Sequence, residues 1–215
     1  MNKIVLIGPP GSGKGTQAKL LADRLDIPHI STGDILRDAV RKETELGRRA
    51  APIMAEGGLV PDDLMIGIIG ERLAEPDAGN GFILDGFPRT VLQAEKLDAL
   101  MAGNGNGALR VVHLLVPDDL IVRRIAARRS CPSCGAVYHL EQSPPSVPGL
   151  CDRCGSALVA RPDDTEEAVR ARLGMFQQKT MPVVTFYRSK EQLHEVDGEG
   201  PVDQVFERVA KHLDG

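Results

Sequence analysis

The sequence predicts an α/β protein in which a central parallel sheet lies between two layers of helices. Short apolar runs rich in Ile, Val and Leu alternate along the chain with segments whose apolar residues recur at helical spacing. Parallel strands need a crossover between them, and a helix usually provides it, so this alternation indicates parallel pairing. At 215 residues, the chain is long enough for one sizeable core and small inserted subdomains. Aromatic residues make up only 3% and tryptophan is absent, so the core is expected to be aliphatic.

Each element of the first half has a local signal. Residues 3–7 read KIVLI, a short β-branched run typical of a buried strand, and a glycine-rich turn and a helical pattern follow it. Residues 31–34, STGD, supply side chains that cap a helix, and Pro61 followed by two aspartates is typical of another helix start. In chain order, this half is expected to contain a strand over 3–7, a helix over 13–25, a strand near 27–30, and helices over 35–42, 45–56 and 64–73.

The second half continues the alternation as far as Cys131 and resumes it after residue 160. The intervening segment is rich in Cys, Pro and Gly and lacks helical periodicity. Asp163 is a candidate N-cap for the helix that restarts at Glu166, which would hold the reciprocal capping position. Pro182 is expected to kink or end that helix. In chain order, the other predicted elements are a strand over 82–84, a helix over 91–101, a flexible loop over 103–107, a strand over 110–116, a helix over 117–129, a strand over 193–196 and a helix over 201–213.

Charge and hydropathy narrow the class of protein. Lys and Arg number 26 against 30 Asp and Glu, which gives a formal net charge of −4 and a pI of about 5.8. This balance argues against a non-specific nucleic-acid binder, which usually carries a basic excess. No apolar run is long enough to predict a transmembrane helix, and the first one is broken at Gly8, unlike a signal peptide. We therefore expect a cytoplasmic protein with reduced thiols and no membrane partner.

The turn after the first strand, GPPGSGKGTQ at residues 8–17, is suited to binding phosphate. Backbone N–H groups converge on anionic oxygens only where glycines leave room, and the following helix adds its N-terminal dipole. Lys14 supplies a cation that can follow the charge on the phosphates. A glycine-rich turn could be a purely structural connection. Its place between a strand and a helix, together with the lysine, favours nucleotide binding.

This turn departs by one residue from the common pattern G-x-x-x-x-G-K-[ST]. Gly15 follows the lysine and the hydroxyl comes at Thr16, which rotates it by about 100° around the helix. In the common pattern that hydroxyl ligates Mg²⁺, so we expect the metal to be held less directly here. Asp85, at the end of a predicted strand, is the candidate carboxylate to orient metal-bound water. An aspartate before Gly86 could also serve only to form a turn.

Four cysteines occur as two pairs, CPSCG at 131–135 and CDRCG at 151–155, with sixteen residues between the pairs. Four thiolates are the tetrahedral set that Zn²⁺ prefers, and each pair is followed by a glycine, as a tight turn requires. Two disulfides are the alternative, which the expected reducing compartment disfavours. We therefore predict a structural Zn²⁺ site, with His139 outside the metal shell, formed by Cys131, Cys134, Cys151 and Cys154.

Four segments of the chain form a set: GPPGSGKGTQ (8–17), STGDILR (31–37), DGFPRT (85–90) and RPDDTEEAVRARL (161–173). In this order, and spread over nearly the whole chain, they resemble the adenylate kinase family in its long-lid form. The resemblance implies a P-loop three-layer sandwich with a helical AMP-binding insertion and a small zinc-bearing lid. The implied boundaries are a core of 1–30, 61–126 and 165–215, an insertion of 31–60 and a lid of 127–164.

The resemblance also implies reversible phosphoryl transfer from MgATP to AMP, giving two ADP, in a monomer that binds no nucleic acid. Transfer would be in line and stabilised by lysine, arginines and Mg²⁺, with no protein nucleophile. Closure of the lid would exclude water, which could otherwise compete as the acceptor.

Site residues follow from the resemblance, position by position. For ATP they are Gly11, Ser12, Gly13, Lys14, Gly15, Thr16, Arg128, Val137, Tyr138 and Gly200. For AMP they are Thr32, Gly33, Arg37, Gly58, Leu59, Val60, Gly86, Arg89, Gln93, Arg161 and Arg172. Catalysis would involve Lys14, Asp85, Arg89, Arg124, Arg128, Arg161 and Arg172, and an acidic pair after the lid matches Asp163 and Asp164. Gly200 departs from relatives that carry lysine there, so only a backbone contact to adenine could survive.

Three other functions stay open at this point. The nearest is a kinase that acts on UMP, CMP or GMP, or that uses GTP as donor, because base recognition would rest largely on Gln93. A nucleic-acid-binding zinc ribbon is disfavoured, since residues 135–150 contain one Tyr and no Lys or Arg. A GTPase-like switch is disfavoured because no hydroxyl directly follows Lys14.

Overall fold

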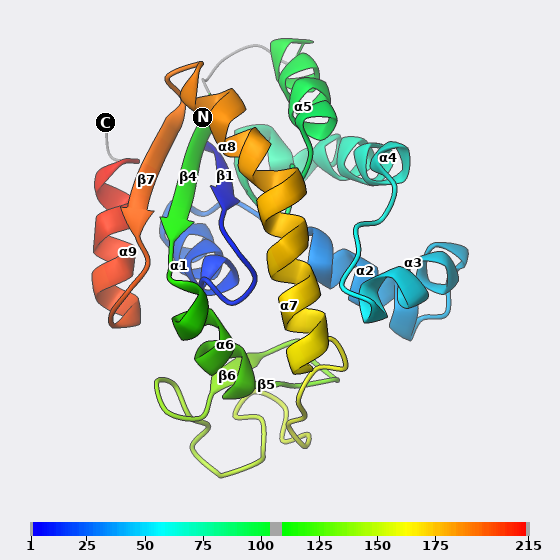
Figure 1. The fold of residues 1–215 in the computed structure, drawn as a ribbon, viewed down its shortest axis with the longest axis vertical. Helices are drawn as coiled ribbons and strands as arrows, with labels where there is room; N and C mark the ends of the chain where they lie inside the picture. Colours follow the sequence, from blue (N-terminus) through cyan, green and yellow to red (C-terminus); the bar gives the residue numbers. More distant parts are fainter. Residues whose placement is uncertain (1, 104–108, 214–215) are drawn as a thin grey trace.

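The computed structural model describes residues 2–103 and 109–213, and a parallel sheet lies at its centre (Figure 1). Within the described residues this sheet has five strands in the order β2-β3-β1-β4-β7. Each connection between consecutive strands of the sheet contains helices, as the alternation predicted. The strands are β1 (Asn2–Ile7), β2 (His29–Ser31), β3 (Gly81–Asp85), β4 (Leu109–Leu115) and β7 (Leu193–Asp197).

Helices cover both faces of the sheet, which confirms the three-layer architecture. Successive side chains of a strand point to opposite faces, so an all-apolar strand requires apolar packing on both sides. In β1, Ile4 and Leu6 pack in one core with α1 and α9, while Val5 and Ile7 pack in a second core with α4, α5 and α8. The bounds of these helices are α1 (Lys14–Leu25), α9 (Val202–Lys211), α4 (Asp62–Leu73), α5 (Val91–Gly103) and α8 (Met181–Arg188).

Two helices, α2 (Thr32–Arg41) and α3 (Glu45–Ala55), follow β2 and pack against each other. The predicted cap of α2 is confirmed, because Oγ of Ser31 accepts a hydrogen bond from the backbone N of Asp34 at 3.3 Å. A Cβ on Gly47 would lie only 2.1 Å from the carbonyl oxygen of Ala39. Glycine at this position therefore lets the two helices approach closely.

The segment that contains the cysteines projects from the carboxyl edge of the sheet, beyond α6 (Asp118–Ala126) (Figure 1). It contains an antiparallel hairpin of β5 (Arg128–Ser130) and β6 (Val137–His139), and residues 131–160 contain no helix, as predicted. The prediction that the preceding helix extends to 129 was wrong. The chain leaves the helix at Ala127 because residues 128–130 pair with β6 instead.

The capping residue of α7 (Glu166–Met175) also differs from the prediction. Thr165 is the N-cap, and its Oγ1 accepts a hydrogen bond from the backbone N of Ala168 at 3.2 Å. Asp163, the predicted cap, instead accepts a hydrogen bond from Nη1 of Arg172 at 3.0 Å. Because the carboxylate of Asp163 pairs with Arg172, the N-cap is Thr165, two residues later in the chain.

Pro182 lies at the start of α8, directly after a π-helical turn over Phe176–Thr180. Proline has no N–H to donate, and the wide turn before it accommodates the lost helical hydrogen bond. Helical turns continue through Pro182 to Arg188, so this proline does not end the helix, and a kink stays a prediction. A short 3₁₀ helix covers Pro76–Asn80.

Two further predictions concern the loop that follows α5 and the lack of a transmembrane helix. Of the predicted loop over 103–107, Gly103 is the last residue of α5, and 104–107 lie outside the described residues. Among the described helices, none combines the length and the apolarity needed to cross a membrane.

Candidate active site

Glycines shape the turn between β1 and α1, at the carboxyl edge of the sheet. Gly11 has a φ of +77° and Gly13 a φ of +97°, values that residues other than glycine rarely adopt. A Cβ on Gly11 would also lie 2.7 Å from Cγ1 of Ile125, so α6 packs directly against the turn. The turn thus presents bare backbone at the N-terminus of α1, which is the arrangement that a phosphate needs.

Lys14 begins α1 and folds back over this turn. Its Nζ donates to the carbonyl oxygens of Gly8 and Pro9, both at 2.8 Å, and to Oγ of Ser12 at 3.3 Å. Burial lowers the pKa of Lys14 to about 8, and the negative charge of Asp85 partly opposes that shift. The hydrogen-bond partners of this buried ammonium are neutral oxygens, so an anionic ligand would stabilise its charged form.

The structure explains why glycine, and not serine or threonine, follows Lys14. A Cβ on Gly15 would lie 3.3 Å from Oδ2 of Asp85, at the end of β3, which is a tight contact for a side chain. Thr16, which carries the displaced hydroxyl, is exposed on the first turn of α1. The glycine therefore keeps open the space between the turn and Asp85, where a hydrated cation would lie.

Asp85 itself is well placed to be ionised. Burial disfavours its charged form, but the nearby His29 and the positive charges of Lys14 and Arg89 outweigh burial and lower the pKa of Asp85. Nε2 of His29 lies 3.5 Å from Oδ2 of Asp85. A buried, ionised carboxylate beside a phosphate-binding turn fits the chemistry of Mg²⁺, which prefers oxygen ligands and keeps several of its waters.

A cavity beside the turn brings together most of the residues predicted to bind AMP. It is open to solvent on one side and is lined by both apolar and charged side chains. Glycine is favoured at Gly86, where φ is +84°, and at Gly33 the absence of a side chain leaves room for the guanidinium of Arg37. The predicted residues that line the cavity are Thr32, Gly33, Arg37, Gly58, Leu59, Val60, Gly86, Arg89, Gln93 and Arg172.

Gln93 lies buried in the wall of this cavity and already makes two hydrogen bonds. Its Oε1 accepts from the backbone N of Arg89 at 2.7 Å, and its Nε2 donates to Oδ1 of Asp62 at 2.8 Å. A glutamine amide offers two donors and two lone pairs, so one of each remains available for a base edge. These bonds also fix the side chain in one orientation.

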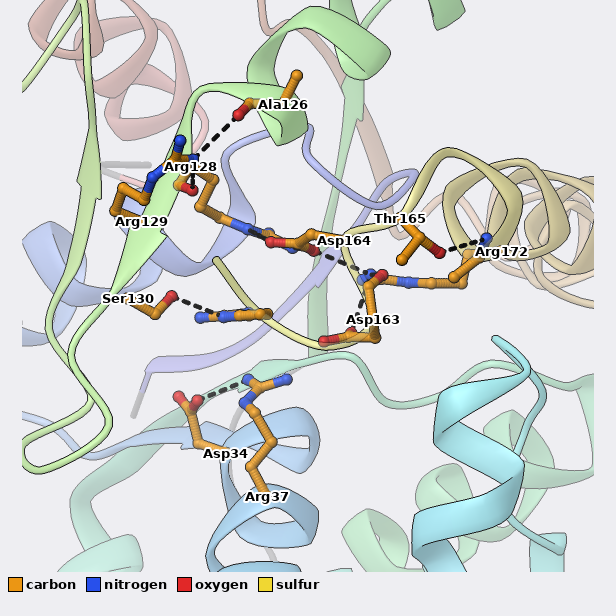
Figure 2. Close-up of polar contacts among 12 residues, drawn as sticks. Asp34, Arg37, Ala126, Arg128, Arg129, Ser130, Asp163, Asp164, Thr165 and Arg172 are labelled. Carbon is orange, nitrogen blue, oxygen red and sulfur yellow. Dashed lines mark hydrogen bonds and ion pairs between the residues drawn. The ribbon is translucent and has the colours of Figure 1, made fainter. Parts of the chain in front are cut away.

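Arginines from several elements converge near this cavity and the glycine-rich turn. Figure 2 shows Arg37 from α2, Arg128 from β5 and Arg172 from α7 directed toward one region, with Asp163 and Asp164 between the last two. Asp164 accepts a hydrogen bond from Nε of Arg128 at 2.8 Å, and Asp34 from Nη2 of Arg37 at 2.6 Å.

Two more arginines of this group, which are partly buried, donate to neutral oxygens. Nε of Arg161 donates to Oγ of Ser130 at 2.8 Å, and Nε of Arg89 donates to the carbonyl oxygen of Gly86 at 2.8 Å. Burial and the neighbouring arginines lower the pKa of each to about 10. Excess positive charge in a buried group of this kind is stabilised by a polyanion.

A second cavity, of about 530 Å³, opens onto Lys14 and the glycine-rich turn. It shares Gly57, Leu59, Gly86, Arg89 and Arg172 with the first cavity, so the two adjoin. Thr180 of the π-helical turn also lines it, and Oγ1 of Thr180 donates to the carbonyl oxygen of Arg89 at 3.1 Å. No local pattern indicated a site role for Thr180 or Asp62, because both act through contacts distant in the chain.

Several predicted residues lie outside the lining of both cavities, among them Arg124, Val137, Tyr138 and Gly200. Nη2 of Arg124 donates to the carbonyl oxygen of Gly198 at 2.9 Å, which ties α6 to the loop after β7. Gly200 lies in that loop with a φ of +103°. Val137 is exposed, and the Tyr138 hydroxyl points toward the cysteines, where it contacts Sγ of Cys151 at 3.5 Å.

The four cysteines form one cluster, as predicted. All four are free, and their sulfur atoms lie within 4.8 Å of one another. The closest pairs, Cys131 with Cys154 and Cys134 with Cys151, are 3.4 and 3.5 Å apart, far longer than the S–S bond of a disulfide. Gly135 and Gly155 have nearly equal φ values of +71° and +72°, so the two turns have matching shapes. This donor set fits a closed tetrahedral Zn²⁺ site.

Comparison with known proteins agrees with the resemblance noted in the sequence. The family model described as "Adenylate kinase" matches residues 6–192. Similar proteins include the adenylate kinases of Clostridium novyi (47% identical over 213 residues, 99% of each chain) and Moorella thermoacetica (48% over 211 residues, 98% of this chain and 97% of the relative). The adenylate kinase of Archaeoglobus fulgidus is 47% identical over 211 residues, again 98% of this chain and 97% of the relative. The chain belongs to the adenylate kinase family.

Proposed function

We propose that the two adjoining cavities hold the two nucleotides and that the arginines between them stabilise the phosphoryl group during transfer. The enzyme is a nucleoside monophosphate kinase, an ATP:AMP phosphotransferase, as its family establishes. The observation that carries the proposal is that Arg89 and Arg172 line both cavities. A group in both walls can contact donor and acceptor phosphates at once. We assign AMP to the cavity lined by Gln93 and ATP to the one that opens onto Lys14.

On the acceptor side, Arg37 and Arg89 would hold the AMP phosphate through bidentate contacts. Gln93 would read the adenine with its free N–H and lone pair, and Thr32 with residues 58–60 would line the adenosine pocket. We further propose that residues 31–60 form the AMP-binding insertion and 127–164 the lid, with the remaining segments as the core.

On the donor side, the backbone of residues 11–16 and the Lys14 ammonium would hold the ATP phosphates. Arg128, Arg161 and Arg172 would stabilise charge on the transferred group, and Asp163 and Asp164 would keep Arg172 and Arg128 aligned. No side chain needs to act as nucleophile, because the acceptor is already a phosphate oxygen. Positioning and charge stabilisation then supply the rate enhancement.

Two metals complete the proposal. Mg²⁺ arrives with ATP and would neutralise charge on its phosphates, and Asp85 would orient the water of that ion across the space that Gly15 leaves open. Zn²⁺ would be held by Cys131, Cys134, Cys151 and Cys154, with no open position, and would stabilise the lid. A monomeric state and a cytoplasmic location stay predictions from the sequence.

Replacing an arginine of the acceptor side tests the assignment of the cavities. Arg37→Ala is expected to raise KM for AMP about 10- to 100-fold, since hydrogen bonds to a charged group contribute about 1.5–3 kcal/mol. KM for ATP should change far less. Arg49→Ala, which removes the same charge from the exposed face of α3, is the matched control and should leave both constants unchanged. Equal changes in the two constants for Arg37→Ala would refute the assignment.

A further inference from the structure

Arg41, the last residue of α2, connects the helix pair α2–α3 to the cysteine segment. Its Nη1 donates to the carbonyl oxygen of Pro132 at 3.1 Å and to that of Ser133 at 3.2 Å. These partners lie 91 and 92 residues away in the chain. No role followed for Arg41 from the sequence, and it lines neither cavity.

The two acceptor carbonyls belong to the turn between two of the cysteines, Cys131 and Cys134. Backbone bonds hold this turn: the N of Gly135 donates to the carbonyl oxygen of Cys131 at 3.0 Å, and the N of Cys134 approaches Sγ of Cys131 at 3.5 Å. Its shape therefore depends on where the two sulfur atoms are held. A metal that fixes the sulfurs also fixes the direction of the carbonyls that Arg41 binds.

Asp38, one helical turn before Arg41, orients the guanidinium. Its Oδ1 accepts from Nη2 of Arg41, and its Oδ2 pairs with Nζ of Lys42 at 2.7 Å. One nitrogen of Arg41 is thus engaged within α2, while the other reaches the cysteine turn. The planar guanidinium presents its two terminal nitrogens in fixed and different directions, so both contacts are made at once.

We propose that Arg41 is a positioning residue that docks the AMP-binding insertion onto the metal-loaded turn at Cys131–Cys134. Through this contact, closure of the insertion over the acceptor site strengthens metal binding in the lid, and metal binding in turn favours closure. The inference rests on the proposed function, since it takes α2–α3 as part of the AMP site. An ion pair or hydrogen bond made by an exposed arginine usually contributes little to stability or binding. The experiment must therefore distinguish a docking role for Arg41 from a surface contact that has no effect.

Binding of two ligands provides the test, with the zinc-loaded protein throughout. Bis(adenosine) pentaphosphate spans both sites and requires both inserted segments to close, whereas a non-hydrolysable ATP analogue occupies the donor site alone. Arg41→Ala is expected to weaken the first ligand about tenfold, within the range typical of coupling between sites, and to leave the second unchanged. Arg49→Ala removes the same charge nearby and should leave both affinities unchanged.

Each other outcome has a defined meaning. Unchanged affinity of Arg41→Ala for the pentaphosphate, or an equal loss for both ligands, would overturn the proposal. Failure of the unmodified protein to bind the pentaphosphate would instead refute the proposed function.

Metal release gives a second readout that does not depend on activity. By linkage, a ligand that closes the insertion onto the turn should slow the transfer of Zn²⁺ to a chromophoric chelator. The slowing by pentaphosphate is expected to be smaller in Arg41→Ala than in the unmodified protein or in Arg49→Ala. Equal slowing in all three proteins would contradict the link between Arg41 and the metal.

Discussion

The glycine-rich turn and the cysteine segment are both irregular chain, yet different forces hold them. The turn is anchored by β1 and α1, whose side chains Ile4, Leu6, Ala18 and Leu21 are almost completely buried. The cysteine segment has a buried apolar cluster of only Cys131, Ala136 and Cys151. In and beside that segment, large apolar side chains are instead exposed: Val137, Leu140, Val147, Leu150 and Val159. The core of the protein therefore stabilises one region, whereas the other has little core of its own and brings four cysteines together.

This difference suits the two tasks that phosphoryl transfer sets. The groups that stabilise charge must be fixed in position before the reaction, which favours a turn between packed elements. The cover that excludes water must leave and return in each catalytic cycle, which favours a small unit with few apolar contacts to the core. A metal lets such a unit keep its own shape without a core of its own.

Lys14→Met is expected to have the largest effect and to act on the turn alone. It removes the buried ammonium that would follow charge on the phosphates, so kcat should fall by about 10³-fold. The fold should persist, because the substitution also removes the cost of burying a charge. A steady-state assay with thermal unfolding of the same sample checks both parts. A normal kcat would refute the role of Lys14. Loss of the folded state would contradict the expectation that Lys14 serves catalysis and not stability.

Removal of Zn²⁺ from the cysteine segment is expected to lower the stability of the protein more than its activity. The melting temperature should fall by about 5–10 °C, as for a loss of roughly 2–3 kcal/mol in a chain of this length. In contrast, kcat at room temperature should stay of the same order, because four thiolates leave no open position for catalysis. Calorimetry before and after treatment with a chelator measures the shift, and added Zn²⁺ should reverse it. An unchanged melting temperature would mean that the metal does not stabilise the segment.

The sequence was most informative where one short segment determines its own structure. The strand at 3–7, the cap at Ser31 and the paired cysteines each depend on neighbours in the chain, and the structure agrees with all three. The departure at Gly15 is visible in the sequence, but the proximity of Asp85 to Gly15 depends on β1 and β3 lying side by side. Local pattern could not supply that distance.

The predictions that differed from the structure involve partners distant in the chain or rival local partners. Asp163 has the chemistry of a helix cap, yet Arg172 competes for its carboxylate. Tyr138 stays a predicted ATP contact, but its hydroxyl lies against Cys151 and accepts a hydrogen bond from the backbone N of Asp152 at 2.9 Å, which no local pattern predicts. For Asp163, the residue type allowed two roles, and packing decided between them.

The smallest predicted effect tests the boundary between the two regions. Thr165 ends the cysteine-containing segment and caps α7, a helix whose Val169 packs against α6. Thr165→Ala should destabilise the protein by about 1 kcal/mol, the usual contribution of an N-cap, with kcat unchanged. Thr165→Ser keeps the capping oxygen and is the matched control, so it should melt close to the unmodified protein. If instead Thr165→Ala lowers kcat without lowering the melting temperature, the cap serves the alignment of Arg172 on α7 more than the stability of the helix.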